Sequence, residues 1–375
     1  MKIAITTLSG VGYGGATYFR NLIPTLAKVD KINEYHIFIQ KNNPLINFIH
    51  QNNFFFYECI QNNDSALIRL LWEQIIFPRE LKKRKIDIVF TAKNANILFA
   101  PCKTIISIQN MEPFCYRQYK NHWKLNIFSW LRAQLTKVSM KKAHRIIAPT
   151  KFVKKYLEER FPKLTNKIDV VYNGNPVRNY IRESTEFAKP THFLLSASKF
   201  IAYANQFNLL QGYSRLYQED DNIPPLWLAG GIHDKLYFEK IKKFIKEKHI
   251  EEKVKILGLI SHERLVQLYA SALVFLFPST LETFSQILVE AMACGVPIAA
   301  SNVPPIPEVC KDAAIYFNPY DPKDISEKIR LLLSDGVLRE NLKKASLERC
   351  KFFDWDKIAI EIVKLFEKVY ADKLT

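Results

Sequence analysis

Short apolar runs alternate with amphipathic stretches along the whole chain. A short apolar run between turn formers is typical of a buried strand, and apolar positions three or four apart are typical of a helix. The strand candidates are Ile3–Thr7, Tyr35–Gln40, Ile86–Thr91, Thr104–Ile108, Arg145–Pro149, Ile168–Tyr172, His192–Ala197, Pro225–Ala229, Lys253–Leu257, Val274–Phe277 and Pro297–Ser301. The helix candidates include Tyr18–Lys28, Leu67–Lys83, Trp123–Lys142, Ile241–Lys248, Glu263–Ala270, Ile287–Ala293 and Ile325–Leu333. This alternation predicts parallel sheets covered by helices, arranged as two doubly wound α/β domains.

A turn-forming cluster at Asn173–Pro176 follows the last strand candidate of the first block. We therefore expect one Rossmann-like domain over residues 1–178 and a second over residues 179–375. The last helix, about residues 355–375, is expected to pack back on the N-terminal domain.

The composition of the chain also indicates the cellular compartment in which we expect the protein. The 375 residues are 48% apolar, and no apolar run approaches the roughly 18 to 20 residues that a membrane span needs. The six cysteines contain no C-x-x-C pair, and the N-terminus lacks the basic-then-apolar pattern of a signal peptide. These features predict a cytoplasmic protein with reduced thiols.

The positive charge is confined to the first half of the chain. Residues 1–180 hold 28 Lys or Arg against 11 Asp or Glu, which accounts for the whole net charge of +17. Such a field attracts anionic partners: lipid headgroups, nucleic acid or phosphorylated acceptors. A basic solvated surface without any partner is the alternative interpretation.

A glycine-rich segment follows the first strand candidate. Gly10, Gly12 and Gly15 satisfy G-x-G-x-x-G, a pattern that lets backbone approach a phosphate at a helix N-terminus. The second strand ends in Gln40 instead of the acid that holds a dinucleotide ribose, which disfavours NAD. We expect Gly14 and Gly15 to contact a ligand; a flexible turn is the alternative.

Two carboxylates stand out in the second half. Glu282 lies in the loop after a strand, where open α/β sheets bind ligands, and Glu290 lies in an otherwise apolar helix that stops at Gly295. A carboxylate accepts hydrogen bonds from sugar hydroxyls, and the free amides from Thr283 to Gln286 are placed to face a diphosphate. The alternative is a solvated Glu282 and a Glu290 that caps a helix or pairs with a Lys.

The E-x7-E spacing, followed by the sequence AMACGVP at residues 291–297, resembles the signature of the retaining family-4 glycosyltransferases of GT-B fold. Further resemblances lie at Asn173–Gly174, Leu228–Gly231, Val254–Gly258, Leu265–Ala270, Pro307–Val309 and Asp312–Ala314, and more loosely at Gly14–Gly15 and Ala143–Thr150. The resemblance implies two Rossmann-like domains facing each other across a cleft. The N-terminal domain would serve the acceptor and the C-terminal domain the nucleotide sugar.

The resemblance also implies residue roles. Glu282 would bind donor-sugar hydroxyls as a catalytic residue, Glu290 would bind the ribose, and Lys199 would neutralise the diphosphate. The remaining donor-side candidates are Asn205, Thr283, Phe284, Ser285 and Gln286, with Phe284 to Gln286 acting through backbone.

The chain departs from the family pattern at several positions. Ala204 replaces the usual Lys, and Lys199 stands where Arg is commoner, although Lys lacks the bidentate fork of Arg. Gln109 and Asn110 replace the usual His-Asp near the reacting sugar; they can bind hydroxyls but cannot titrate near neutral pH. Thr283 and Ser285 stand where the family favours glycine.

The family chemistry keeps the anomeric configuration and needs no dedicated base, because the departing phosphate oxygen takes the acceptor proton. We therefore expect a GDP- or UDP-linked donor, no metal and no further cofactor. The expected acceptor is a saccharide or a lipid-linked saccharide in cell-envelope polysaccharide or glycolipid synthesis.

The helix candidate Trp123–Lys142 combines tryptophans with lysines. Trp123, Trp130, Lys137, Lys141 and Lys142 suit an anionic membrane surface, so we expect peripheral binding at the inner face of the cytoplasmic membrane. A core-packed helix with a solvated basic face is the alternative.

Two rival functions remain at this stage. A GT-B-fold epimerase or phosphorylase is the rival within enzymes, although no pyridoxal-phosphate lysine site is identifiable. A basic nucleic-acid-binding protein is the rival from another class. No zinc finger, recognition helix or aromatic RNA-binding signature supports it, so nucleic acid is not an expected partner.

Overall fold

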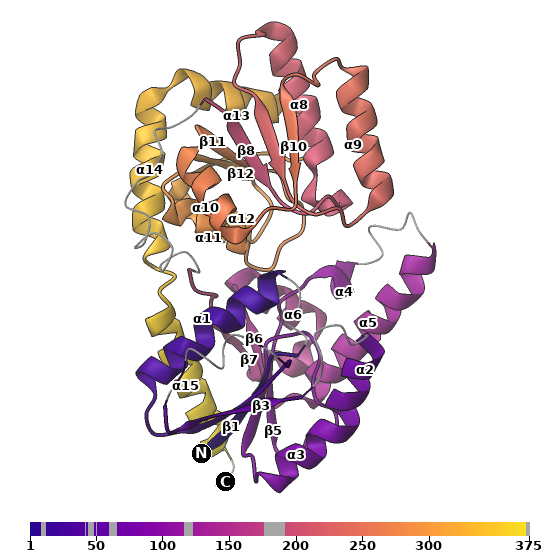
Figure 1. Ribbon diagram of the computed structural model, residues 1–375, viewed down its shortest axis with the longest axis vertical. Helices are drawn as coiled ribbons and strands as arrows, with labels where there is room; N and C mark the ends of the chain where they lie inside the picture. Colours follow the sequence, from indigo (N-terminus) through magenta and orange to yellow (C-terminus); the bar gives the residue numbers. More distant parts are fainter. Residues whose placement is uncertain are drawn as a thin grey trace. The chain divides into compact units, whose positions relative to one another are not determined.

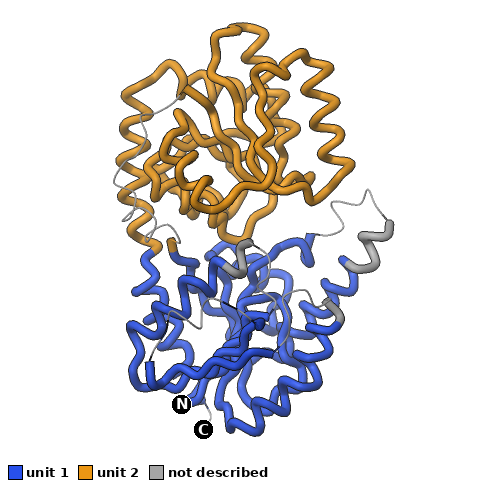
Figure 2. The backbone as a smooth tube through the Cα atoms, viewed as in Figure 1, with its two compact units in different colours: residues 1–174, 354–375 blue, residues 175–353 orange. Residues whose placement is uncertain are grey.

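The computed structural model describes residues 1–8, 13–41, 43, 49, 51–59, 66–115, 123–175 and 192–372. The chain divides into two compact units, which Figure 2 shows in blue and orange. Unit 1 comprises residues 1–174 and 354–375, and unit 2 comprises residues 175–353. The division falls four residues before the boundary that the sequence suggested, and the last helix belongs to unit 1.

Unit 1 is built on a seven-stranded parallel sheet in the order β3-β2-β1-β4-β5-β6-β7. Its strands are β1 (Lys2–Thr6), β2 (Glu34–Ile39), β3 (Phe54–Glu58), β4 (Ile88–Thr91), β5 (Lys103–Ser107), β6 (Arg145–Ala148) and β7 (Ile168–Val170). Its helices are α1 (Tyr13–Val29), α2 (Ala66–Leu71), the π-helix η2 (Trp72–Ile76), α3 (Phe77–Lys83), α4 (Glu112–Cys115), α5 (Trp123–Lys142), α6 (Lys151–Arg160), the 3-10 helix η4 (Pro162–Lys167) and α15 (Trp355–Ala371). Figure 1 shows the helices on both faces of the sheet, as expected for a doubly wound unit.

Unit 2 repeats the plan with a six-stranded parallel sheet in the order β10-β9-β8-β11-β12-β13. Its strands are β8 (Leu194–Ala197), β9 (Leu226–Ala229), β10 (Val254–Gly258), β11 (Val274–Phe277), β12 (Ile298–Ser301) and β13 (Ala314–Phe317). Its helices are η5 (Ala202–Ala204), α8 (Gln206–Glu219), α9 (Lys235–Glu247), α10 (His262–Ser271), α11 (Gln286–Ala293), α12 (Ile306–Cys310), η6 (Lys311–Ala313), α13 (Pro322–Ser334) and α14 (Gly336–Cys350). The two-domain α/β fold predicted from the alternating pattern is confirmed.

The chain crosses between the units at two neighbouring points. The Asn175 amide donates to the Phe353 carbonyl over 2.7 Å. Beside them, the Trp355 ring covers Gly174 so closely that an added Cβ would lie 2.3 Å from Trp355 Cδ2. Residue 174 must therefore be glycine, because Trp355, the first residue of α15, leaves no room for a side chain there.

Helix α15 completes the core of unit 1. Its buried Ile358, Ile362 and Phe366 pack in one cluster with α1 and with the central strands. In Figure 1 the yellow α15 accordingly lies beside the indigo α1. A segment from the end of the sequence thus covers one face of the first sheet.

Several elements of the structure are not among those that the pattern predicted. Strands β3 and β13 lie at sheet edges and are only partly buried; Phe55 of β3, for example, is 40% exposed. Helix α8 was also not expected. The helix predicted over residues 67–83 contains the π-helical turn η2 between α2 and α3.

Candidate functional site

The strand order of unit 2 places its central loops together. The chain runs from β8 outward through β9 and β10, then returns to the other side of β8 with β11. Ligands of open α/β sheets bind at this kind of switch point, beyond the carboxyl ends of the strands. Lys199 follows β8 and Glu282 follows β11, so the fold brings these two loops to one edge.

The two loops are joined by hydrogen bonds. The Tyr203 carbonyl accepts from the Thr280 amide (2.8 Å) and from the Thr280 hydroxyl (3.0 Å). The Asn205 side-chain amide donates to the carbonyls of Pro278 (3.1 Å) and Pro319 (2.7 Å). Asn205 is buried and left-handed at φ 61°, so the side chain that the sequence assigned to the donor spans two loops instead of pointing outward. Its donor role stays a prediction.

Glu282 is only partly exposed in the loop after β11. Burial of the carboxyl, which disfavours its charged form, raises the pKa of Glu282 to about 7. A carboxyl with this pKa is half-protonated near neutral pH, so a ligand that donates hydroxyl hydrogen bonds to it favours its charged form.

Ser285 explains why glycine suits this position. Its φ of 69° and ψ of 62° are left-handed, a conformation that costs other residues roughly 1 to 2 kcal/mol. Its hydroxyl does not cap α11. The adjacent Phe284 is buried edge-on against Phe353 (5.3 Å between ring centroids), so only its backbone can face a ligand. Thr283 and Gln286 flank this stretch and are partly exposed.

Glu290 is buried on α11 and has a partner that sequence reasoning missed. Its Oε1 lies 3.2 Å from His262 Nε2, at the first turn of α10. The sequence-based alternatives for a buried Glu290 named a Lys or a cap, not a His. Its second oxygen, Oε2, has no hydrogen-bond partner among the residues described here, so the carboxylate is held on one side and free on the other.

The edge beyond β8, β9 and β10 combines a cation with apolar side chains. Lys199 is exposed and forms no ion pair with any residue that the structure describes. Gly230 approaches β8 so closely that a Cβ would lie 1.9 Å from the Ser198 carbonyl oxygen. Leu259 (59% exposed) and Ile232 (54% exposed) extend from the same edge. This edge therefore offers charge and apolar surface together, as a nucleotide requires.

The unit 1 candidates follow β1 and β5, on either side of that sheet's switch point between β1 and β4. Gly14 and Gly15 fall in the first turn of α1, whereas Gly10 and Gly12 lie outside the described residues. Gln109 follows β5 and pairs with Asn173 through both amide groups, at 3.1 and 3.4 Å. Its backbone amide, like that of Asn110, donates to Asn94 Oδ1.

Gln109 and Asn110 themselves carry no ionisable side chain. Gln109 Nε2 also donates to Ser107 Oγ over 2.8 Å, and Asn110 donates to the Glu112 carboxylate over 3.2 Å. Hydrogen bonds thus fix the orientation of Gln109 and Asn110, and neither side chain titrates near pH 7. The site can orient hydroxyls at this position, but Gln109 and Asn110 cannot exchange protons there.

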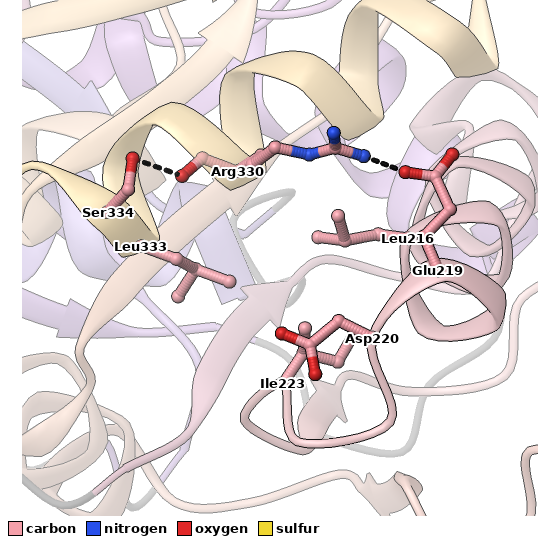
Figure 3. Close-up of a pocket in the computed structure, with 7 residues that line it drawn as sticks. All are labelled: Leu216, Glu219, Asp220, Ile223, Arg330, Leu333 and Ser334. Atoms are coloured by element: carbon pink, nitrogen blue, oxygen red, sulfur yellow. Dashed lines mark hydrogen bonds and ion pairs between the residues drawn. The ribbon is translucent and has the colours of Figure 1, made fainter.

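A cavity of about 390 Å³ lies elsewhere in unit 2. Figure 3 shows its lining at the C-terminal ends of α8 and α13, including Leu216, Asp220 and Leu333, with Arg330 paired to Glu219. Because both helices follow strands of a parallel sheet, this is the sheet edge opposite to Glu282. The cavity is therefore separate from the candidate donor site.

The proposed membrane residues lie on α5. Trp130 is 48% exposed, Lys141 and Lys142 are exposed, and Lys137 is partly exposed. The side chain of Trp123 lies outside the described residues. None of the helices in the described part of the chain is both long and apolar enough to cross a bilayer.

Two models of known protein families match consecutive parts of the chain. Residues 13–177 match the model of Glycosyltransferase Family 4, and residues 177–349 match that of Glycosyl transferases group 1. The two matches meet where unit 1 passes into unit 2. The chain therefore belongs to the glycosyltransferases of two-domain GT-B fold.

Curated relatives match parts of the chain. It is 34% identical over 161 residues to O-antigen chain mannosyltransferase B of Escherichia coli, covering 42% of this chain and 41% of that protein. It is 28% identical over 222 residues to N-acetyl-alpha-D-glucosaminyl L-malate synthase of Bacillus anthracis, covering 56% and 55%. The chain thus spans less than two thirds of the length of these relatives.

Solved structures match nearly the whole chain. Sucrose-phosphate synthase of Thermosynechococcus elongatus superposes with a TM-score of 0.74 at 18% identity, over 99% of this chain and 100% of that one. HepE of Anabaena, solved with UDP-glucose, gives 0.72 at 15% identity, over 98% and 100%. WaaG, a glycosyltransferase of lipopolysaccharide biosynthesis, gives 0.71 at 12% identity, over 97% and 99%. At these identities the likeness establishes the fold.

Proposed function

We propose that this chain transfers a sugar from a nucleotide-sugar donor to a saccharide or lipid-linked acceptor, with retention of the anomeric configuration. The observation that carries the proposal is the switch point of unit 2. Lys199 follows the central strand β8. The loop after the neighbouring strand β11 contains Glu282 and the backbone of Thr283 to Gln286, and Glu290 lies in α11, the helix that follows this loop. Carboxylates for hydroxyls and amides for phosphates are the groups that a nucleotide sugar needs.

In the proposed reaction, the acceptor hydroxyl attacks the anomeric carbon from the face on which the nucleotide leaves. The bond from that carbon to the phosphate oxygen breaks, and the departing oxygen takes the acceptor proton. Lys199 and the amides before α11 stabilise the charge that develops on the leaving diphosphate. Glu282 holds the sugar hydroxyls, and the free oxygen of Glu290 accepts from the ribose.

The orienting groups of unit 1 fit this reaction. Gln109 and Asn110 hold fixed amide positions and would bind hydroxyls of the reacting sugar or the acceptor. Their inability to titrate is compatible with a reaction in which the leaving phosphate is the base. Gly14 and Gly15, at the start of α1, would bring backbone amides toward the donor.

We propose a GDP- or UDP-linked donor, used without a metal. The relative named O-antigen chain mannosyltransferase B and the HepE complex with UDP-glucose support a hexose donor of this class. The names of WaaG and of the E. coli relative support a role in envelope polysaccharide or glycolipid synthesis. We further propose peripheral binding at the inner face of the cytoplasmic membrane, supported by the positive first half of the chain.

A thermal-shift screen against nucleotide sugars tests the donor, because a ligand of the native state raises the melting temperature. Transfer is then assayed with the stabilising donor, and product anomers are assigned by NMR. The Glu282→Gln variant should lose turnover more than nucleotide affinity, and Glu290→Ala should lose nucleotide affinity. Inversion of the anomeric centre, or stabilisation by no nucleotide sugar, contradicts the proposal.

A further inference from the structure

The solvent-facing side of the α2–η2 helix is apolar. Ile68 (48% exposed), Leu71 (49%) and Ile75 (49%) form an outward stripe, whereas Glu73 and Phe77 point inward and are buried. Ile76 is 44% exposed beside this stripe. A surface helix normally carries its polar residues outward, so this arrangement is reversed.

Helix α5 has the same reversal. Among its described positions, the buried residues are Ala133, Thr136 and Ser139, which are small or polar, together with Met140. Its exposed residues include three that are large and apolar: Trp130 (48% exposed), Leu131 (49%) and Val138 (41%). The described part of α5 thus exposes large apolar residues beside its lysines, which is not the arrangement of a core-packed helix whose solvated face is only basic.

One loop joins the two helices into a single surface. Gln74 of η2 accepts from the Leu98 amide (2.9 Å) and donates to the Asn96 carbonyl (3.0 Å). On the other side, the Asn96 amide donates to Ser139 Oγ of α5 over 3.0 Å. Phe99 is 68% exposed in this loop, and the Lys142 ammonium lies 5.4 Å from its ring centroid.

The charges around this surface are almost all positive. The basic residues of this region are Arg69 on α2, Arg79, Lys82 and Lys83 on the following helix α3, and Arg132, Lys137, Lys141 and Lys142 on α5. The acids within reach are neutralised, since Glu73 is buried against Lys93 and Glu80 is paired with Arg84. A second copy of the chain would bring the same positive charge, whereas an anionic leaflet complements it.

We propose that Ile68, Leu71, Ile75, Ile76, Phe99, Trp130, Leu131 and Val138 form one α2–η2–α5 surface that inserts into an anionic lipid leaflet. The inference rests on the proposed membrane binding and adds to it an apolar anchor on α2–η2. It also connects the bilayer to the acceptor side. Arg132 of α5 lies 3.4 Å from Glu112, which accepts from Asn110. A lipid-linked acceptor would thus emerge beside the candidate acceptor amides.

Vesicle co-sedimentation separates insertion from charge attraction. Exposed charges are screened at about 0.5 M salt, whereas buried apolar area is not. Wild-type protein should therefore keep part of its binding to phosphatidylglycerol vesicles at that salt. The triple variant Leu71→Ser, Ile75→Ser, Phe99→Ser should still bind at low salt through charge attraction, although more weakly than wild type. At high salt it should bind at least about 100-fold more weakly than wild type, since each inserted side chain is worth roughly tenfold.

The matched control changes three exposed apolar residues outside the surface: Ile32→Ser, Leu331→Ser and Val337→Ser. It should bind as wild type does. Nucleoside diphosphate affinity, measured in solution, should be unchanged in both triple variants. If wild-type protein binds vesicles but no nucleoside diphosphate, the result would count against the proposed transferase and not against this surface. Equal loss in control and test variants overturns the surface, as does a stable dimer in solution that only the test variant dissociates.

Discussion

At the scale of the residue, the two carboxylates of the E-x7-E pair have different surroundings. Glu282 is partly exposed with a raised pKa, whereas Glu290 is buried against His262. One is poised to become charged when hydroxyls arrive, and the other is already oriented by a neighbour. These environments lead to separate predictions for the two residues.

Replacing Glu282 with Gln should change how stability depends on pH. The folded-state pKa of about 7 lies above the ordinary value of 4.5, so the native state binds this proton more tightly than the unfolded state. The stabilising contribution is complete below about pH 4.5 and is lost between about pH 4.5 and 7. Glu282→Gln should therefore gain about 3 kcal/mol relative to wild type between pH 4.5 and 8.

Urea unfolding at several pH values measures this difference. Glu290→Gln is the matched control, because it removes a carboxylate of the same helix-loop segment. A Glu282→Gln difference that stays constant over the whole pH range would show that the carboxyl is not perturbed.

His262 should act as a positioning residue for Glu290. Its Nε2 lies 3.2 Å from Oε1 and leaves Oε2 for a ribose diol. His262→Ala should weaken nucleoside diphosphate binding roughly tenfold, the worth of a hydrogen bond to a charged group. His262→Gln should recover much of the affinity because its amide can donate from a similar position. Calorimetry measures both; equal loss in the two variants would mean that packing, and not the hydrogen bond, matters.

At the scale of the element, the most constrained position is where α15 meets the turn at Gly174. The strand β7 ends nearby, and the Trp355 ring occupies the space of a Cβ on that glycine. Helix α15 contributes a large part of the unit 1 core, so a shift at its first residue is transmitted to a packed interface.

Gly174→Ala should destabilise the protein by about 2 kcal/mol or more, because its Cβ would lie 2.3 Å from Trp355. Gly336→Ala is the control, since the nearest atom to its Cβ would be the flexible end of Arg339 at 3.5 Å. Melting temperatures from calorimetry compare the two. Similar values for both variants would show that the Trp355 contact is easily displaced.

At the scale of the whole molecule, the excess positive charge lies entirely in the first half of the sequence. The excess that gives +17 lies within residues 1–180 and includes an acid-free stretch from Pro113 to Leu157. This asymmetry concerns association with other molecules and not the fold, because the two sheets are built alike.

Replacing Lys137, Lys141 and Lys142 with Glu should weaken low-salt binding to phosphatidylglycerol vesicles by at least about 100-fold. Each basic residue near an anionic surface is worth about 1 kcal/mol, and the reversal adds repulsion. Nucleotide affinity should stay at the wild-type value. Binding to neutral vesicles of phosphatidylcholine is the reference, and equal binding to both lipids would assign the basic half to another partner, such as a soluble phosphorylated acceptor.

The sequence by itself determined the two-sheet plan and many of the points at which its strands and helices end. Central strands such as β8 and β11 are buried on both faces, so they are mostly apolar and can be recognised from the sequence. Gly295 has the left-handed φ of 68° expected after α11. Glu282 and Glu290 were conspicuous because carboxylates are costly where neighbours are apolar.

Only the tertiary structure decided the partners of these residues. His262 is 28 residues from Glu290, and Asn173 is 64 residues from Gln109, so no local period relates them. Likewise, apolar residues lie on both sides of α5, and only packing against the sheet and the residue 96–99 loop determined that Trp130 and Val138 face outward. Local patterns fix which elements form, whereas long-range contacts fix which side of each element is covered and which polar atoms meet.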